Sequence, residues 1–272
     1  MKRVAFIGAG NMSRCILVGM VNNGFDPNSI IVSNPSAPKR LALQQQYGVL
    51  QTDDNIEAAT FADVIFLSVK PHLIKQVCAQ IKSAMDIRHK CFISVAAGVS
   101  LEQMHSVLGQ EAHIIRCMPN TPSQLGFGMS GMYAPSHIDA DYKAFADQAL
   151  SSVGKVLWLE TEDKIDDLIT VSGSGPAYFF AFMEAMQQQA IRFGFDPKTA
   201  RTLVEQTALG AAQMVVQNSD EIATLRENVT SKGGTTQAAL NQFEQGGLAE
   251  LVTQAMEKCK ARAKEMTQSN NS

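Results

Sequence analysis

The fold of this chain is decided by VAFIGAGNMS, residues 4–13. A short apolar run leads there into a glycine-rich turn and then into helix-forming residues, which is the opening of a dinucleotide-binding βαβ unit. Gly8 permits the tight turn, and Gly10 lets a pyrophosphate approach the backbone. The third small position carries Ser13 in place of the usual Gly or Ala. The stretch predicts a dinucleotide cofactor at the N-terminus of a helix over residues 11–23.

Further apolar runs predict the other strands of an α/β sheet, at residues 29–32, 62–69, 91–95, 114–118, 125–135 and 155–159. The run over 62–69 is nearly continuous, as in a central parallel strand that is covered on both faces. Ligands of open α/β sheets lie beyond the carboxyl ends of the strands, so the residues at these ends are expected to line one cofactor cleft. They are Ser33, Asn34, Val69, Lys70, Pro71, Val95, Ala96, Ala97 and Asn120.

The end of the second predicted strand bears on the choice of cofactor. NAD-binding units carry an acidic residue there for the ribose 2′-hydroxyl, and this chain has none. Neutral donors stand in its place, at Ser33, Asn34 and Ser36, with Lys39 and Arg40 close behind. This pattern favours a 2′-phosphate, hence NADPH, with NADH as a possible substitute. The alternative is that the two cations belong to an ordinary solvated helix face.

Composition limits the remaining classes. With 272 residues the chain is expected to form two domains, and its net charge of −3 gives no field that attracts nucleic acid or anionic lipid. No apolar run reaches the length of a membrane span or of a signal-peptide core. The cysteines are scattered and form no CxxC pair, which indicates reduced thiols in the cytoplasm and no zinc site. They stand at Cys15, Cys78, Cys91, Cys117 and Cys259.

The second half of the chain is predicted to be helical. After residues 160–163 no convincing strand occurs, so we place a domain boundary between 161 and 162 and expect an all-helical domain over 162–272. Its helices are expected at 177–192, 197–217 and 248–265, with a frayed polar end over 267–272. The first of them is apolar around much of its circumference and has to be buried. Homodimerisation through this domain would bury it, and so would packing against the first domain.

One loop of the second half, VTSKGGTT over residues 229–236, precedes a predicted helix. Adjacent glycines let the backbone turn sharply, and hydroxyls with free N–H groups at a helix N-terminus suit an anion. The alternative is a helix cap with a tight turn and no ligand.

Taken together, these motifs make the chain resemble the Δ1-pyrroline-5-carboxylate reductase family over essentially its whole length. The motifs that carry the resemblance are FIGAGNM (6–12), SVKP (68–71), RCMPNTP (116–122), SGSGPAY (172–178) and NVTSKGGTT (228–236). The first is generic, whereas the last two, in this order and spacing, are specific. The resemblance implies reduction of 1-pyrroline-5-carboxylate to L-proline by hydride transfer from NAD(P)H, the final step of proline biosynthesis. It also implies a Rossmann-like domain followed by a helical dimerisation domain, and in some members rings of dimers.

The resemblance also assigns residues to the site. Cofactor contacts fall on Gly8, Ala9, Gly10, Asn11, Met12, Asn34, Asn55, Val69, Lys70, Pro71, Ala96, Ala97 and Asn228. The resemblance implies that the substrate carboxylate is bound by Ser231, Gly233, Gly234, Thr235 and Thr236. It further implies that Thr236 lies near the imine nitrogen as the catalytic group, and that Glu162 contacts the substrate. Lys232 departs from the Pro that relatives carry between Ser and Gly-Gly, and it either loosens the loop or adds a cation.

Two rival functions remain. A hydroxyacid dehydrogenase of similar build needs a Lys, with an Asn four residues on, early in the first helix of the second domain, where this chain has apolar residues near Phe179 and Met183. A non-catalytic NADPH sensor would explain the absence of an acid–base dyad but gives no role to residues 231–236. His72, after Lys70-Pro71, lies either near the cofactor or in a surface loop. The five histidines show no metal-ligand spacing, so no metal is expected.

Overall fold

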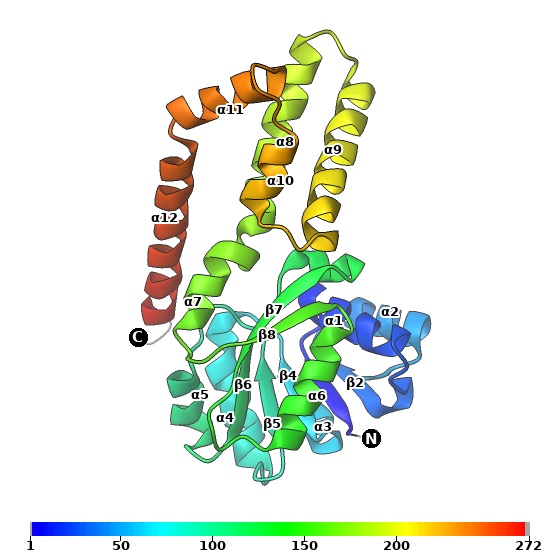
Figure 1. The fold of residues 1–272 in the computed structure, drawn as a ribbon. Coiled ribbons are helices and arrows are strands. Elements are labelled where there is room, and N and C mark those ends of the chain that lie inside the picture. Colours follow the sequence, from blue (N-terminus) through cyan, green and yellow to red (C-terminus); the bar gives the residue numbers. More distant parts are fainter. Residues whose placement is uncertain (1, 270–272) are drawn as a thin grey trace. The chain divides into compact units, whose positions relative to one another are not determined.

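A computed structural model describes residues 2–269. Within these residues the chain forms two compact units, one comprising the chain up to Ser174 together with the residues from Cys259 on, and the other Gly175–Lys258. Figure 1 shows a sheet flanked by helices in the first unit and helices alone in the second. This confirms the predicted order of an α/β nucleotide-binding domain and a helical domain.

The described strands form one eight-stranded sheet with the order β3-β2-β1-β4-β5-β6-β7-β8. All neighbours are parallel except β6 and β7, which run antiparallel. The short β3 was not expected from the sequence. The strands are β1 (Val4–Ile7), β2 (Ile30–Ser33), β3 (Leu50–Thr52), β4 (Val64–Leu67), β5 (Cys91–Ser94), β6 (His113–Met118), β7 (Gly128–Tyr133) and β8 (Gly154–Trp158).

Helices cover both faces of this sheet. One buried cluster joins the sheet to α1, α2 and α6, and a second joins the other face to α3, α4 and α5. Such double coverage explains why β1 and β4 are apolar at every position. The helices are α1 (Asn11–Asn22), α2 (Ala37–Tyr47), α3 (Asn55–Phe61), α4 (Ile74–Ala84), α5 (Leu101–Leu108) and α6 (Ala140–Ser151).

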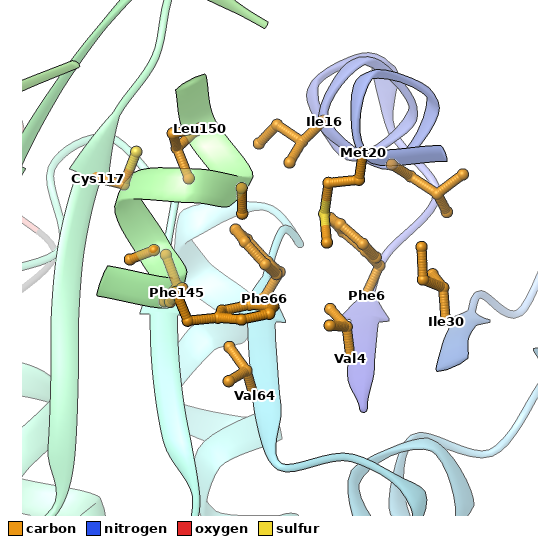
Figure 2. Close-up of a cluster of buried hydrophobic side chains, with 14 of the residues drawn as sticks. Val4, Phe6, Ile16, Met20, Ile30, Val64, Phe66, Cys117, Phe145 and Leu150 are labelled. Carbon is orange, nitrogen blue, oxygen red and sulfur yellow. The ribbon is translucent and has the colours of Figure 1, made fainter. Parts of the chain in front are cut away.

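The first cluster aligns the two central strands (Figure 2). The rings of Phe6 in β1 and Phe66 in β4 stack with centroids 4.6 Å apart. The register pairs Ile7 with Leu67, so β1 and β4 end side by side. The glycine-rich turn after β1 therefore lies directly against the residues that follow β4.

Residues 162–174 belong to the first unit, although the sequence analysis placed them in the helical domain. They include α7 (Lys164–Leu168) and a π-helical turn, Ile169–Gly173. Asp167 forms ion pairs with Lys164 and with Lys260 of α12 (Leu248–Ser269), and these cations hold the pKa of its carboxyl below the ordinary value. The compact units thus divide after residue 174, because both ends of the helical stretch are tied to the sheet unit.

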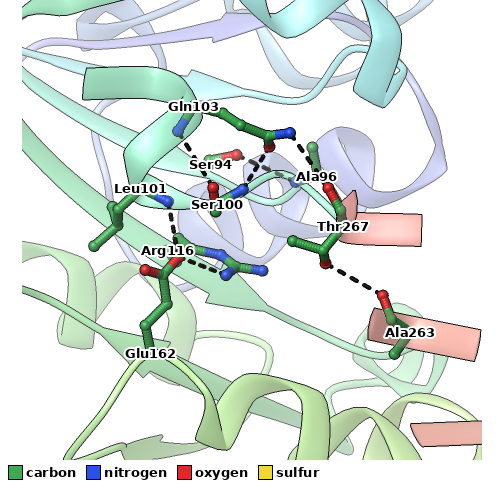
Figure 3. Close-up of polar contacts among 9 residues, drawn as sticks. All are labelled: Ser94, Ala96, Ser100, Leu101, Gln103, Arg116, Glu162, Ala263 and Thr267. Carbon is green, nitrogen blue, oxygen red and sulfur yellow. Dashed lines mark hydrogen bonds and ion pairs between the residues drawn. The ribbon is translucent and has the colours of Figure 1, made fainter. Parts of the chain in front are cut away.

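The predicted fraying of residues 267–272 is wrong for 267–269, and 270–272 lie outside the described residues. Helix α12 continues to Ser269. Near its end the Thr267 carbonyl accepts a hydrogen bond of 3.4 Å from the Gln103 side chain, and Ala263 is buried (Figure 3). A tertiary contact therefore extends the helix beyond the point where its sequence turns polar.

The second unit contains α8 (Gly175–Arg192), α9 (Pro197–Gln217), α10 (Ile222–Asn228), α11 (Thr235–Gln245) and the first half of α12. No strand occurs among its described residues, as predicted. Its surface exposes many large apolar side chains, among them Phe179 at 71%, Phe180 at 62% and Val216 at 67%. No helix in residues 2–269 is long and apolar enough to cross a bilayer.

Candidate active site

The glycine-rich turn after β1 has the geometry of a pyrophosphate site. Gly8 has φ +107°, and a Cβ there would lie 2.6 Å from the Ser68 carbonyl oxygen. Gly10 is different, because a Cβ there would meet no protein atom within 4 Å. The turn thus needs glycine at position 8 to pack against β4, and it is open at position 10, where a ligand can approach.

Helix α1 begins with free donors beside that opening. Gly10 is its N-cap and supplies no side-chain cap, and the first helical bond runs from the Arg14 N–H to the Gly10 carbonyl at 3.0 Å. The N–H groups of the first turn therefore have no partner within the helix and suit a phosphate. These residues fit the pyrophosphate of a dinucleotide. Ser13, in the same turn, is fully buried and its hydroxyl has no hydrogen-bond partner in the described chain.

Three polar side chains, two from the end of β2 and one from the start of α3, lie beside this turn. The Asn34 carboxamide oxygen accepts from the Ala9 N–H at 3.1 Å, which fixes Asn34 against the glycine-rich turn. The Ser33 hydroxyl donates to the Asn55 side-chain oxygen at 2.7 Å. Ser33 is fully buried, so its hydroxyl orients Asn55 at the start of α3. These are the places where an adenosine ribose is expected in a dinucleotide-binding sheet.

The two cations after β2 have different surroundings. Arg40 pairs with Asp53 at 3.1 Å, and its side chain is only 13% exposed. Lys39 is exposed, and Ser36 is the exposed N-cap of α2 with no side-chain cap bond. The prediction of a solvated helix face is therefore wrong for Arg40, whereas Ser36 and Lys39 are accessible to a ligand.

The segments after β4 and β5 extend the same edge of the sheet. The Val95 N–H donates to the Leu67 carbonyl at 3.2 Å, and the Ala96 N–H donates to the Ser94 hydroxyl at 3.4 Å. Within these segments Lys70 is exposed, and residues 95–97 are half-buried. His72 is exposed, in agreement with a surface position. The predicted cofactor residues Val69, Lys70, Pro71, Val95, Ala96 and Ala97 thus all lie at this edge.

Glu162 is engaged in a network inside the first unit. Its carboxylate accepts from Arg116 Nη1 at 2.6 Å and from the Leu101 N–H at 2.7 Å, in the first turn of α5 (Figure 3). The Arg116 side chain is 7% exposed, so the pair is largely removed from water. The charge is balanced by the guanidinium and by the helix N-terminus. Sequence reasoning missed Arg116 as the partner, and contact of Glu162 with the substrate stays a prediction.

In the second unit, loop 229–236 forms a tight turn before α11. The Gly234 N–H donates to the Ser231 carbonyl at 3.0 Å, and Gly233 has φ +71°. The Gly233 N–H donates to the Gln237 side chain at 2.5 Å, a contact that sequence reasoning missed. Asn228 ends α10 just ahead of this loop.

The hydroxyl residues of this loop are accessible. Ser231, Thr235 and Thr236 are exposed, and α11 starts at Thr235 from an N-cap, Gly234, that has no capping side chain. The first N–H groups of α11 are thus free of helical partners. The helix-cap alternative is correct only in part, because none of these side chains caps α11. Lys232 is exposed as well.

Three of the five cysteines are buried and chemically inert. All five cysteines are free, and Cys78, Cys91 and Cys117 are buried. Burial raises the pKa of Cys78 to about 12 and raises the pKa values of Cys91 and Cys117 further above the ordinary value. These thiols stay protonated at neutral pH and are poor nucleophiles.

The open sheet, the glycine-rich turn ahead of α1 and the helical second unit define a two-domain NAD(P)-dependent oxidoreductase. A family model described as "NADP oxidoreductase coenzyme F420-dependent" matches residues 3–98, and one described as "Pyrroline-5-carboxylate reductase dimerisation" matches residues 162–266. The chain is 52% identical to a pyrroline-5-carboxylate reductase of Vibrio alginolyticus, over 97% of both chains. It belongs to the pyrroline-5-carboxylate reductase family.

Other relatives agree with this assignment. A pyrroline-5-carboxylate reductase of Haemophilus influenzae is 42% identical over 97% of both chains. Among solved structures, that of a pyrroline-5-carboxylate reductase from Coxiella burnetii has a TM-score of 0.93 at 42% identity and 98% coverage of both chains. The Plasmodium falciparum enzyme, solved with NADP bound, has a TM-score of 0.86 at 25% identity, again over 98% of both chains.

Proposed function

We propose that this chain reduces 1-pyrroline-5-carboxylate to L-proline with a nicotinamide cofactor, the final step of L-proline biosynthesis. The observation that carries the proposal is loop 231–236, which presents hydroxyls and free N–H groups at the start of α11 without using them for capping. We place the reaction in the cytoplasm, in line with the five free cysteines.

The residues of the chain act by binding and orientation. Bound NAD(P)H supplies a hydride to the carbon of the C=N bond. The first N–H groups of α11 and the Ser231 hydroxyl hold the substrate carboxylate. The Thr236 hydroxyl accepts a hydrogen bond from the N–H of the protonated imine, and then donates a hydrogen bond to the ring nitrogen of the amine product. A cyclic imine is readily protonated near neutral pH, so the loop needs no strong acid, and fixed orientation lowers the barrier.

An absorbance assay of NADPH consumption tests this function. We expect oxidation of NADPH with 1-pyrroline-5-carboxylate and formation of proline in equal amounts. Turnover of a 2-hydroxyacid or of its 2-oxoacid partner in place of the imine would support the dehydrogenase alternative. Binding of NADPH without turnover of either substrate would support a sensor.

For the cofactor, we propose a preference for NADPH over NADH. Ser36 and Lys39 are accessible at the N-terminus of α2, where the helix end favours an anion. Arg40 is tied to Asp53 and acts by holding α2 against the loop after β3.

Replacing Lys39 by alanine is expected to raise KM for NADPH by about 3- to 10-fold, the effect of one exposed charge-assisted contact with the 2′-phosphate. KM for NADH should stay unchanged, because NADH has no phosphate there. Steady-state kinetics with both cofactors measure the difference. The control is Lys155→Ala, which removes an exposed lysine from β8. Equal effects on NADPH and NADH would rule out the phosphate contact.

For assembly, we propose a homodimer through the helical unit, with larger rings of dimers as a further possibility. The apolar side chains exposed on α8 and α9 would be costly to leave in water, and an isologous interface would cover them.

The variant Phe179→Glu/Phe180→Glu should therefore shift the protein to monomers, because it places charges in an apolar interface. Sedimentation or light scattering of the purified protein gives the mass. Gln188→Glu, which adds a charge at an exposed polar position of the same helix, should leave the dimer intact. A double-glutamate variant that remains fully dimeric would contradict an interface at this part of α8.

A further inference from the structure

The π-helical turn Ile169–Gly173 lies where the chain leaves the first unit. The Ser174 N–H donates to the Ile169 carbonyl at 2.8 Å, which spans five residues instead of the usual four. Residue 174 is the last of the first unit before the crossing to Gly175. Single π-helical turns are rare and occur often at functional places in helices.

A proline leaves one carbonyl of this turn without a hydrogen-bond donor inside the helix. In a continuous helix the Ser172 carbonyl would accept from the N–H of residue 176, but residue 176 is Pro and has no N–H. Asn120 fills the gap, since its side-chain amide donates to the Ser172 carbonyl at 2.9 Å. The carboxamide oxygen of Asn120 accepts from the Met129 N–H, also at 2.9 Å.

Both ends of the Asn120 amide are thus occupied by main-chain groups, and the residue is 8% exposed. One end reaches the start of β7, the other reaches the π-helical turn, and Asn120 itself follows β6 at the edge of the sheet. These bonds use the oxygen and one of the two N–H groups of the amide, and little of its surface is left for a cofactor. The cofactor contact of Asn120 stays a prediction, and the two main-chain bonds give its side chain a structural role.

The chain crosses back to the first unit beside the same turn. The second crossing lies between Lys258 and Cys259, within α12. The Cys259 sulfur is 3.2 Å from the Ser174 hydroxyl oxygen, so the two crossings touch. Both segments that lead out of the first unit therefore meet within it, and the Asn120–Ser172 bond is a brace on the first of them.

We infer that Asn120 is a positioning residue of the reductase, which acts through Ser172 by fixing the π-helical turn just ahead of α8. The inference rests on the proposed function. Loss of the brace loosens this turn and slows hydride transfer, which needs fixed orientation. It leaves the binding of the cofactor to the first unit intact.

Two variants test this role. Asn120→Asp keeps the oxygen that accepts from Met129 but removes the N–H donors, and Asn120→Ala removes both. The matched control is Ser172→Ala, which deletes the hydroxyl bond to the Leu168 carbonyl and keeps the carbonyl that Asn120 binds. Thermal unfolding checks that all three variants are folded at the assay temperature.

For both Asn120 variants we expect kcat lowered by about 10-fold, with the dissociation constant of NADPH within about 2-fold of the parent value. NADPH fluorescence gives the binding constant. The isotope effect on kcat with NADPH deuterated at C4 should rise, because hydride transfer becomes slower than the other steps. Hydrogen exchange should be faster in a peptide that covers residues 169–176, and Ser172→Ala should match the parent protein in every readout.

A clearly raised dissociation constant of NADPH in both Asn120 variants would overturn the inference and support the predicted cofactor contact. Unchanged kcat and unchanged exchange would overturn it as well. An inactive parent protein would refute the proposed function instead, and the exchange measurement would still decide whether Asn120 braces the turn.

Discussion

Replacing Thr236 by alanine is expected to lower kcat/KM for 1-pyrroline-5-carboxylate by about 10- to 100-fold, through one lost hydrogen bond and a less fixed substrate. Thr236 is exposed in the first turn of α11, and the turn before it is held by Ser231 and Gln237 rather than by Thr236. The substitution should therefore leave the loop intact. Binding of NADPH, which depends on the first unit, should not change.

Steady-state kinetics at saturating NADPH measure this effect, and Thr236→Ser is the matched control. Serine keeps the hydroxyl and loses only a methyl group, so it should retain most of the activity. Thr230→Ala is a second control, because the Thr230 hydroxyl donates to the Arg226 carbonyl at 2.6 Å and serves α10 only. Kinetics of Thr236→Ala equal to those of the parent protein would exclude a role of this hydroxyl.

Alanine substitutions at the two glycines of the cofactor turn are expected to have different effects, one on NADPH binding and the other on stability. Gly10→Ala should fold normally, because its added methyl meets no protein atom within 4 Å and Gly10 has φ −78°. The methyl would stand where the pyrophosphate approaches, and we expect the dissociation constant of NADPH to rise by about 10- to 100-fold. Titration of NADPH fluorescence measures the change.

Gly8→Ala should instead destabilise the first unit by about 2 to 4 kcal/mol, from an unfavourable φ and a clash with the Ser68 carbonyl. Thermal unfolding measures the loss. Gly24→Ala separates the two causes, because Gly24 has φ +88° and open space around it, so only the backbone penalty applies. If Gly8→Ala and Gly24→Ala lowered the stability equally, the clash with the Ser68 carbonyl would contribute nothing to the loss.

Local patterns were sufficient to predict most elements. The turn over residues 4–13, α9 over 197–217 and the helical second half follow from apolar periodicity, glycine placement and the Pro that opens α9. The three-residue strand β3 was not predicted, because so short a run shows no periodic pattern of apolar residues. It forms by pairing with the edge of β2.

Partners that are distant in sequence could not be predicted. Arg40 pairs with Asp53, and Glu162 pairs with Arg116 forty-six positions earlier. The residues adjacent in sequence therefore gave no indication of either ion-pair partner. The same holds for Asn120, whose two partners stand in β7 and in the π-helical turn. A strand end shows that a side chain arrives at an edge, whereas the hydrogen bonds there depend on how the whole sheet closes.

The return of α12 to the first unit has a consequence for how the protein is made. The sheet unit is discontinuous, since the partners of Gln103 and Asp167 in α12, namely Thr267 and Lys260, are synthesised only after the intervening helices α8 to α11. Domains generally fold as units during synthesis, starting from the N-terminus. Here the nascent sheet unit stays incomplete while α8 to α11 are synthesised, until the second half of α12 is available to complete it.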